Sequence, residues 1–472
     1  MIKRARDFEL TEMIELMRKG ELTSHQIVQS CLEAVEAYNE KFRAFISIDA
    51  DEVLAQSRKI DLQPGKKKGP LKGIPVAIKD LIDVAGQVTT AGSSFFRNAK
   101  PAESDAPIIQ RLREAGAIIF GKTNLHEFAW GGTSENPHFG FCRNPWNPEH
   151  CAGGSSGGSG LAIATHMAPG ALGTDTLGSI RHPSSFCGVV GLKPTFGLLE
   201  TQGIFPLAYT FDHVGPMART VADVETIFEA LLDQKARRLL SRGRGKKKIS
   251  LKKSKRLEGI RMGRLTALVP KEICHETTWQ KYEKAFEFAE DEGAIVVNEH
   301  IPDFETALAT GFTLTYAQAS EIHYERMAKN PEGFGEDVRS LLELGYMVSA
   351  VDYVRAQRLR AKLVEEGKHL TERIDAWIFP TTPKPAPRIG QPIDPTLAFF
   401  TAPICTLGFP SVAIPSGITP EGLPVSIQII SGPYKEGLLL EIAKILEERL
   451  DFPKELPTWI ASATALSFPS KQ

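Results

Sequence analysis

The sequence predicts an α/β fold with parallel strand pairing. Short β-branched segments alternate with helical patterns, and the first of these segments is Ile74–Ile78. A helix–glycine–strand order then runs from the helical pattern Ala106–Ala115 through Gly116 to the apolar run Ala117–Phe120. The same order recurs later in the chain and ends in the apolar run Ala294–Val297. Strands that alternate with helices of about 10–15 residues are typical of βαβ units.

The first part of the chain predicts an N-terminal helical segment of about residues 1–65. Apolar side chains recur at helical spacing over 10–20 and 23–38, so one face of each helix should pack on the rest of the chain. Thr23 or Ser24 is placed to cap the second helix.

Composition excludes several classes of protein. The chain has 472 residues, a formal net charge of -1, 42% hydrophobic and 24% charged residues. This balance predicts no global attraction to nucleic acid or to an anionic membrane. The N-terminus is charged and lacks an apolar signal region, and no run of about 18 apolar residues occurs. Six scattered cysteines without CxxC pairing are typical of reduced thiols. We therefore expect a cytoplasmic protein without a membrane span.

Two segments depart from the average composition. Residues 235–256, "KARRLLSRGRGKKKISLKKSKR", hold twelve Lys or Arg and no acid. They predict a solvated basic surface insertion, with a binding site for RNA or another polyanion as the alternative. Residues 379–395, "FPTTPKPAPRIGQPIDP", are rich in proline and predict an extended surface loop.

Two short motifs match known patterns but lack the required context. "GAIIFGKT", Gly116–Thr123, fits the phosphate-loop pattern, but its central residues are bulky and apolar and favour a buried strand. "GGSSG", Gly153–Gly157, fits the nucleophile-elbow pattern, but a polar, proline-broken loop precedes it instead of a hydrophobic strand. The pairs His126–Glu127 and Cys274–His275 are too sparse for a metal site.

Three segments taken together are more informative. They are "GIPVAIKD" ending near Lys79, the loop "GGSSGGSG" at 153–160, and "GTDTLGSIRHPSSFCGVVGLKPT" at 173–195. In this order they resemble the amidase signature family of serine hydrolases, and the resemblance extends over most of the chain. It implies a single domain over 1–472, with a mixed, largely parallel central sheet covered by helices on both faces. It implies no metal and no organic cofactor.

The resemblance carries a catalytic triad onto Lys79, Ser155 and Ser179. Ser179 would be the nucleophile, Lys79 the base and Ser155 the serine that bridges them, on a cis peptide bond after Gly154. Lys79 acts as a base only when it is neutral, and burial at the end of an apolar strand would lower its pKa. Ser155 would pass the proton of Ser179 to Lys79 and return it to the departing amine. Ser156 is the rival for the bridging position, but Ser155 has the expected 24-residue offset to Ser179.

The resemblance also implies the surroundings of the reacting atoms. Asp175 and Arg181 would shape the catalytic loop. The oxyanion would be held by backbone N–H groups of Thr176, Leu177, Gly178 and Ser179. The substrate pocket would include Phe128, Ala129, Trp130, Gly131 and Gly132, with Tyr316 and 401–405 as further candidates. The aromatic side chains of Phe128 and Trp130 favour a substrate with an uncharged acyl or aryl group.

Some positions depart from the family pattern. Leu177 stands where the family has a glycine, Cys405 where an asparagine is common, and Ser426 where a glycine is common. These differences are compatible with hydrolysis, but they do not indicate which substrate is hydrolysed.

The leading functional hypothesis is therefore a stand-alone amidase that acts on a small amide, ester or carbamate (urethane) through an acyl-enzyme, as a monomer or a homodimer. The alternative is the glutaminase-like component of a tRNA-dependent amidotransferase, which needs partner subunits. A third reading is a binding scaffold with an inactive site.

Overall fold

The computed structural model describes residues 3–63, 69–243, 256–264, 271–298, 304–450, 452–453 and 460. Within these ranges the strands form one 11-stranded sheet and a two-stranded sheet, β4–β5. The strands are β1 Phe45–Ser47, β2 Pro75–Lys79, β3 Ile118–Thr123, β4 Glu135–Asn136, β5 Gly140–Phe141, β6 Gly170–Asp175, β7 Val190–Lys193, β8 His213–Ala218, β9 Arg261–Arg264, β10 Ile295–Asn298, β11 Ala376–Pro380, β12 Ser411–Ile418 and β13 Pro424–Ser431.

The large sheet is mixed, and its strand order is β1-β3-β2-β6-β8-β7-β12-β13-β11-β9-β10. Parallel pairing occurs in two groups, β3–β2–β6 and β11–β9–β10. Antiparallel ladders connect the two groups through β8, β7, β12 and β13. The predicted α/β fold with a mixed sheet is confirmed, with parallel pairing concentrated in these two groups.

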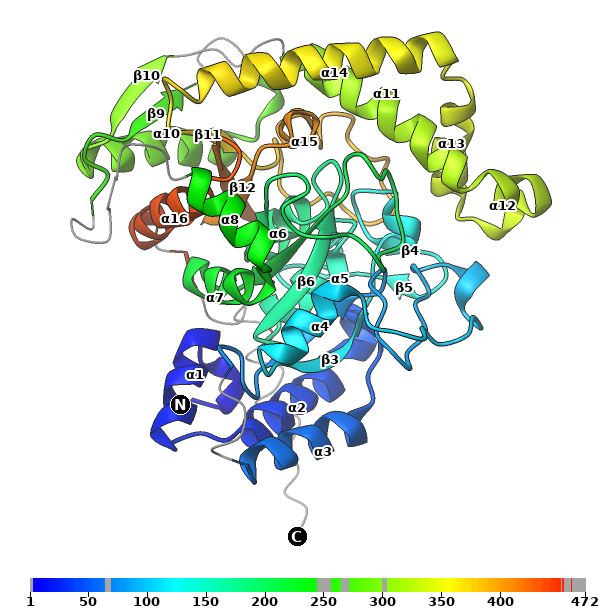
Figure 1. Cartoon of the computed structure of the whole chain (residues 1–472), viewed down its shortest axis with the longest axis vertical. Coiled ribbons are helices and arrows are strands. Elements are labelled where there is room, and N and C mark those ends of the chain that lie inside the picture. Colours follow the sequence, from blue (N-terminus) through cyan, green and yellow to red (C-terminus); the bar gives the residue numbers. More distant parts are fainter. Residues whose placement is uncertain are drawn as a thin grey trace.

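Helices cover both faces of the sheet (Figure 1). On one face α5 and α6 pack against each other and against the strands from β2 to β13. On the other face α4, α7, α16 and α10 form a continuous layer, because each contacts the next. These helices are α4 Pro107–Glu114, α5 Gly157–Ala164, α6 Arg181–Cys187, α7 Val221–Leu231, α10 Glu276–Asp291 and α16 Glu436–Leu450.

The N-terminal helices lie together at one end of the molecule, drawn in blue in Figure 1. They are α1 Leu10–Lys19, α2 Ser24–Phe42 and α3 Ala50–Asp61. The side chain of Thr23 accepts a hydrogen bond from the backbone N–H of Gln26 and so caps α2, as predicted.

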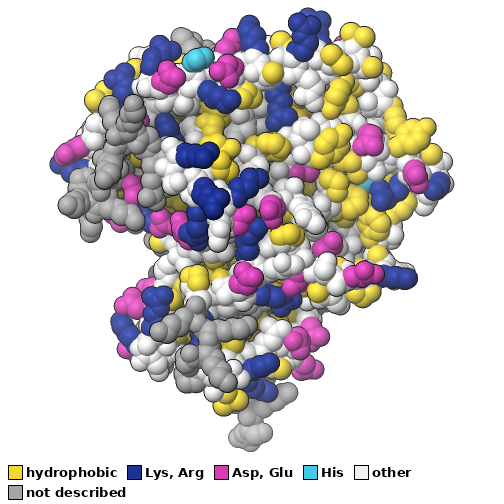
Figure 2. Space-filling view, in the orientation of Figure 1, with side chains coloured by type: hydrophobic (Ala, Val, Ile, Leu, Met, Phe, Trp, Pro, Cys, Tyr) yellow, Lys and Arg dark blue, Asp and Glu magenta, His cyan; other side chains and the backbone are white. Residues whose placement is uncertain are grey.

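A helical arm covers the opposite end of the molecule, drawn in yellow-green and yellow in Figure 1. Its helix α11 contacts both α13 and α14, and α15 packs beneath α11 and α14. Apolar side chains are exposed on its outer surface (Figure 2), among them Tyr324, Met347 and Val351. The helices of this part are α11 Phe304–Ile322, α12 Tyr324–Lys329, α13 Glu336–Tyr346, α14 Ala350–Leu370 and α15 Ala402–Leu407.

Two predicted surface segments have different outcomes. The basic segment begins in helix α8, Gln234–Gly243, and its residues 244–255 lie outside the described residues. The proline-rich segment is only partly a surface loop, because its first residues end strand β11 and Thr381 and Thr382 are buried. Within the described ranges, no helix combines the length and the apolar character needed to cross a bilayer.

Candidate active site

Lys79 is the last residue of β2, a strand that is buried along its whole length. Its neighbours β3 and β6 pair with it in parallel, so the side chain emerges at the carboxyl edge of three parallel strands. Its Nζ lies 2.6 Å from Ser155 Oγ and 2.7 Å from Thr174 Oγ1. The amine is fully buried and in contact with two hydroxyl groups.

The environment lowers the pKa of Lys79 well below its usual value. Burial is the main cause, because removal of water disfavours the ammonium form, while the charges of Asp175 and Asp212 act in the opposite direction. Asp212 receives a hydrogen bond from Thr176 Oγ1 at 2.7 Å, and burial raises its own pKa to about 6. For Lys79 the effect of burial is larger than that of the two carboxylate charges, so the net shift of its pKa is downward.

The serine loop approaches Lys79 from the start of α5. The peptide bond between Gly154 and Ser155 is cis. A side chain at Gly154 would stand 2.8 Å from the carbonyl oxygen of Gly131 and 2.8 Å from the nitrogen of Thr133, so only glycine fits there. The Ser156 hydroxyl donates to the backbone oxygen of Thr174 at 3.1 Å. Ser155 rather than Ser156 is thus the serine whose hydroxyl contacts Lys79.

Ser179 follows β6 in the turn that leads into α6. The backbone N–H of Ser156 donates to the carbonyl of Ser179 at 3.1 Å, which ties this turn to the serine loop. Gly178 has a φ of 145°, and a Cβ on it would stand 2.3 Å from His182 Nε2. The turn therefore depends on glycine at 178.

An ion pair lies directly beneath this turn. The Arg181 guanidinium donates to both carboxylate oxygens of Asp175, at 2.9 and 3.1 Å, and both residues are fully buried. Burial would raise the pKa of Asp175, but the Arg181 charge holds it far below its usual range. Arg181 also donates to Gln428 Oε1 at 2.9 Å and to Cys405 Sγ at 2.9 Å. The pair thus joins the Ser179 turn to the C-terminal part of the sheet.

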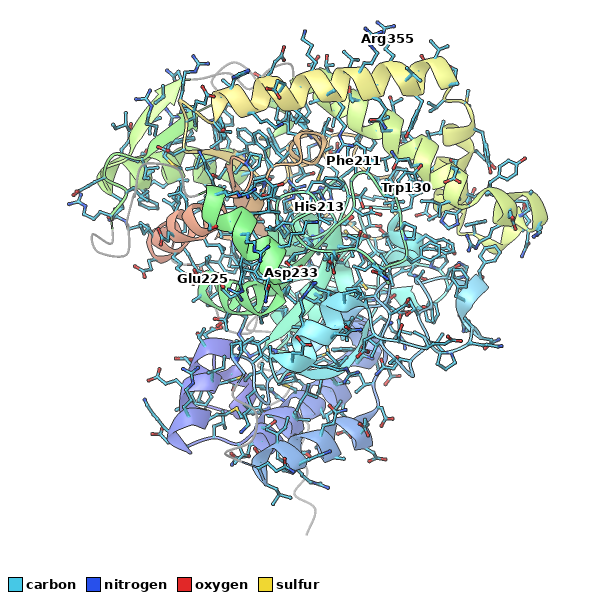
Figure 3. All side chains as sticks on the ribbon, in the orientation of Figure 1. Trp130, Phe211, His213, Glu225, Asp233 and Arg355 are labelled. Atoms are coloured by element: carbon cyan, nitrogen blue, oxygen red, sulfur yellow. The ribbon has the colours of Figure 1, made fainter. Side chains whose placement is uncertain are left out.

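A cavity of about 350 Å³ opens at Ser179. Trp130 forms part of it beneath the helical arm (Figure 3), with its ring centroid 5.3 Å from that of Tyr316. The cavity is lined mainly by apolar side chains and by the Ser179 turn. Its lining consists of Ala129, Trp130, Gly131, Gly132, Thr176, Leu177, Gly178, Ser179, His182, Leu207, Phe312, Tyr316, Leu341, Ile393, Asp394, Pro395, Leu397 and Ala398.

Most of the predicted site residues lie together. Lys79, Ser155 and the turn from Thr176 to Ser179 meet at the carboxyl edge of β2 and β6, and Ala129 to Gly132 form one wall of the cavity. Phe128 lies apart from the cavity lining: it is fully buried, with its ring centroid 5.4 Å from that of Phe205.

Sequence reasoning missed several residues of this site. Thr174 and Asp212 contact Lys79 and Thr176, respectively. Phe312 and Leu341 come from helices of the arm that carry no recognisable motif. Of these residues, only Thr174 could have been found from the sequence, because it lies within the glycine-rich segment that precedes Ser179.

Comparisons with known proteins identify the family and the fold of the chain. The family model described as Amidase matches residues 26–440. The chain is 36% identical to the A component of the glutamyl-tRNA(Gln) amidotransferase of Symbiobacterium thermophilum, over 91% of this chain and 94% of that protein.

Two solved structures have the same fold. One, described as a vestigial protein complex that reveals the evolutionary origins of an s-triazine catabolic enzyme, has a TM-score of 0.85 and 31% identity, and the match covers 94% of this chain and 98% of that one. The other, a crystal structure of an amidase, has a TM-score of 0.83 and 30% identity, and covers 94% and 100%. The chain belongs to the amidase signature family, whose members act on carbon–nitrogen bonds.

Proposed function

We propose that this protein hydrolyses amide bonds of uncharged, largely apolar substrates through an acyl-enzyme on Ser179. The observation that carries the proposal is the contact of 2.6 Å between the buried amine of Lys79 and the hydroxyl of Ser155. A neutral amine has one lone pair and two N–H groups. It accepts the Ser155 proton with the lone pair and donates to Thr174 Oγ1 at 2.7 Å.

The proton then moves in two stages. Ser155 takes the proton of Ser179 as it gives its own to Lys79, and the Ser179 oxygen attacks the substrate carbonyl. The same path runs in reverse to protonate the departing amine, which leaves far more readily than an amide anion. Water enters in place of the amine and hydrolyses the acyl-enzyme by the same steps.

The turn before Ser179 would hold the negative charge that develops on the carbonyl oxygen. Thr401 Oγ1 donates to the carbonyl of Leu177 at 2.7 Å, and Thr176 Oγ1 donates a hydrogen bond to the carboxylate of Asp212. Peptide groups anchored in this way are favourable donors, because they need little reorganisation when the charge appears. We assign the oxyanion site to the backbone N–H groups of Thr176, Leu177, Gly178 and Ser179.

The cavity supports an uncharged acyl group. Among the described residues that line it, Asp394 is the only Asp, Glu, Lys or Arg, and it is paired with Lys384 at 2.8 Å. Burial lowers the pKa of His182 to about 4, so this imidazole is neutral at pH 7. Aliphatic and aromatic groups such as Leu177 and Phe312 form the rest of the surface. Esters and carbamates with the same acyl group fit the same chemistry.

The second candidate is the glutaminase component of a tRNA-dependent amidotransferase. The sequence comparisons favour this candidate over the first, since the chain is 36% identical to such a component over 91% of its length. Free glutamine, however, carries an α-carboxylate, and no Lys or Arg occurs among the described residues of the cavity lining. This difference in charge makes the first candidate the better fit to the cavity.

One experiment tests the proposal and separates the two candidates. The purified chain is assayed alone with butyryl p-nitroanilide, p-nitrophenyl butyrate and glutamine, and Ser179 is labelled with a fluorophosphonate. We expect anilide and ester hydrolysis together with labelling, all lost in Ser179→Ala and retained in the matched control Ser185→Ala. Glutamine hydrolysis that needs added partner subunits, without anilide turnover, would favour the second candidate.

A further inference from the structure

His126 and Glu127 connect the serine loop to the start of α13 in the helical arm. His126 Nε2 lies 2.8 Å from Asp337 Oδ2, and the carboxylate of Glu127 accepts a hydrogen bond from the backbone N–H of Gly335 at 2.7 Å. Both histidine and glutamate are buried. Two consecutive side chains after β3 therefore hold the same turn of the arm.

The same histidine is part of the hydrogen-bond network around Ser155. Its backbone N–H donates to the carbonyl of Ser155 at 3.1 Å. Its Nδ1 accepts a hydrogen bond from the backbone N–H of Ser134 at 3.1 Å, and Ser134 Oγ donates to the Ser155 carbonyl at 3.1 Å. Because a backbone N–H can only donate, Nδ1 carries no proton and Nε2–H donates to Asp337.

Packing strengthens this connection. The His126 ring lies so close to Gly131 that a Cβ there would stand 2.2 Å from Nε2. The carbonyl oxygen of Gly131 in turn stands 2.8 Å from the position of a Cβ on Gly154, the residue before Ser155. The ring, the wall of the cavity and the serine loop thus pack without space between them, so a rotation of the ring displaces the loop.

The arm held by Asp337 also forms one side of the substrate cavity. Leu341 of α13, one turn beyond Asp337, lines it, as do Phe312 and Tyr316 of α11. The contact between His126 and Asp337 therefore joins the outer wall of the cavity to the loop that carries the bridging serine.

We propose that Asp337 is a positioning residue that acts through His126 to hold Ser155 between Lys79 and Ser179. The proposal rests on the proposed function, because it concerns the proton path of that reaction. Asp337 touches neither the triad nor the cavity. Its carboxylate fixes the orientation of the imidazole, which fixes Ser134 and the Ser155 carbonyl.

The leaving group gives a readout that distinguishes positioning from folding. An anilide needs a proton from Ser155 to leave, whereas p-nitrophenolate leaves without one. Misplacement of Ser155 therefore slows anilide hydrolysis more than ester hydrolysis. A loss of folded protein lowers both rates by the same factor.

The experiment compares kcat for butyryl p-nitroanilide and p-nitrophenyl butyrate in three variants of the full chain. In Asp337→Ala we expect the anilide-to-ester ratio to fall about tenfold, as for a displaced catalytic group. Asp337→Asn should stay near the wild-type ratio, because its amide oxygen still accepts from His126 Nε2. The matched control is Glu336→Ala, which removes an exposed acid in the same helical turn and should leave the ratio unchanged.

Each result bears on the proposal. The side chain of Asp337 is 45% exposed, so the variants should fold, and urea unfolding is the measurement that checks this. An unchanged ratio in folded Asp337→Ala would overturn the proposal, and so would a ratio as low in Asp337→Asn or in the control. Failure of the proposed function itself is distinct, since the wild-type chain would then hydrolyse neither substrate.

Discussion

Replacement of Lys79 by methionine separates the cost of burying an amine from its use in catalysis. Methionine fills a similar volume without a titratable group. Burial lowers the pKa of Lys79 well below its usual value, whereas a lysine in the unfolded chain titrates near pH ~10.4. The folded protein therefore binds fewer protons at this position than the unfolded chain, so this group makes stability increase with pH.

The size of the effect follows from the burial and the two contacts. A lysine that is neutral at pH 7 in the folded chain costs stability for each pH unit below its ordinary pKa, roughly 4–5 kcal/mol in total. Methionine removes this cost, but the buried hydroxyls of Ser155 and Thr174 then lose their hydrogen bonds to Nζ. Each lost hydrogen bond lowers the free energy of unfolding by about 1–2 kcal/mol. We expect Lys79→Met to be more stable than the wild type at pH 7 by about 1–3 kcal/mol.

The assay is urea unfolding of both proteins at several pH values, combined with anilide hydrolysis. The advantage of the variant should shrink by about 1.4 kcal/mol per pH unit above pH 7, because the unfolded lysine approaches its own pKa. Anilide hydrolysis should be lost at neutral pH. A variant less stable than the wild type at pH 7, or a difference that does not change with pH, would refute the reasoning.

Three further predictions concern the surroundings of the triad. Gly178→Ala should abolish labelling of Ser179, because its Cβ would collide with His182 and the φ of 145° disfavours a side chain; normal labelling would contradict this. Arg181→Met should lower the free energy of unfolding by about 3–5 kcal/mol, because it leaves the carboxylate of Asp175 buried without a partner; a loss below about 1 kcal/mol in urea unfolding would count against it. Trp130→Ala should raise KM for anilides about tenfold, which corresponds to about 1.4 kcal/mol of binding free energy, with a smaller change in kcat. An unchanged KM in steady-state kinetics would show that Trp130 does not bind the substrate.

The local pattern of the chain was sufficient to predict its local structure. The helical pattern predicted at 106–115 is α4, Pro107–Glu114, and the following apolar run is β3, Ile118–Thr123. The bulky residues that argued against a phosphate loop at Gly116–Thr123 are buried in that strand. These predictions succeed because periodicity and glycine act over a few residues, within one element.

Predictions about which part of the molecule a segment packs against were less complete. Phe128 was expected in the substrate pocket, but it is buried among other aromatic rings and is absent from the cavity lining. The proline-rich segment was expected on the surface, yet Ile393, Asp394 and Pro395 from its end line the cavity. In both cases an apolar or proline-rich segment carries no information about which surface it faces.

The sequence by itself determined which residue types could do chemistry here. It placed a lysine at the end of an apolar strand and glycines around two serines, and these choices limit local backbone and solvation. Only the tertiary structure decided that Thr174 meets Lys79, that Asp212 faces Thr176, and that the arm closes one side of the cavity. Those contacts join segments tens to hundreds of residues apart, and their geometry depends on how the helices and the sheet pack, which no local pattern encodes.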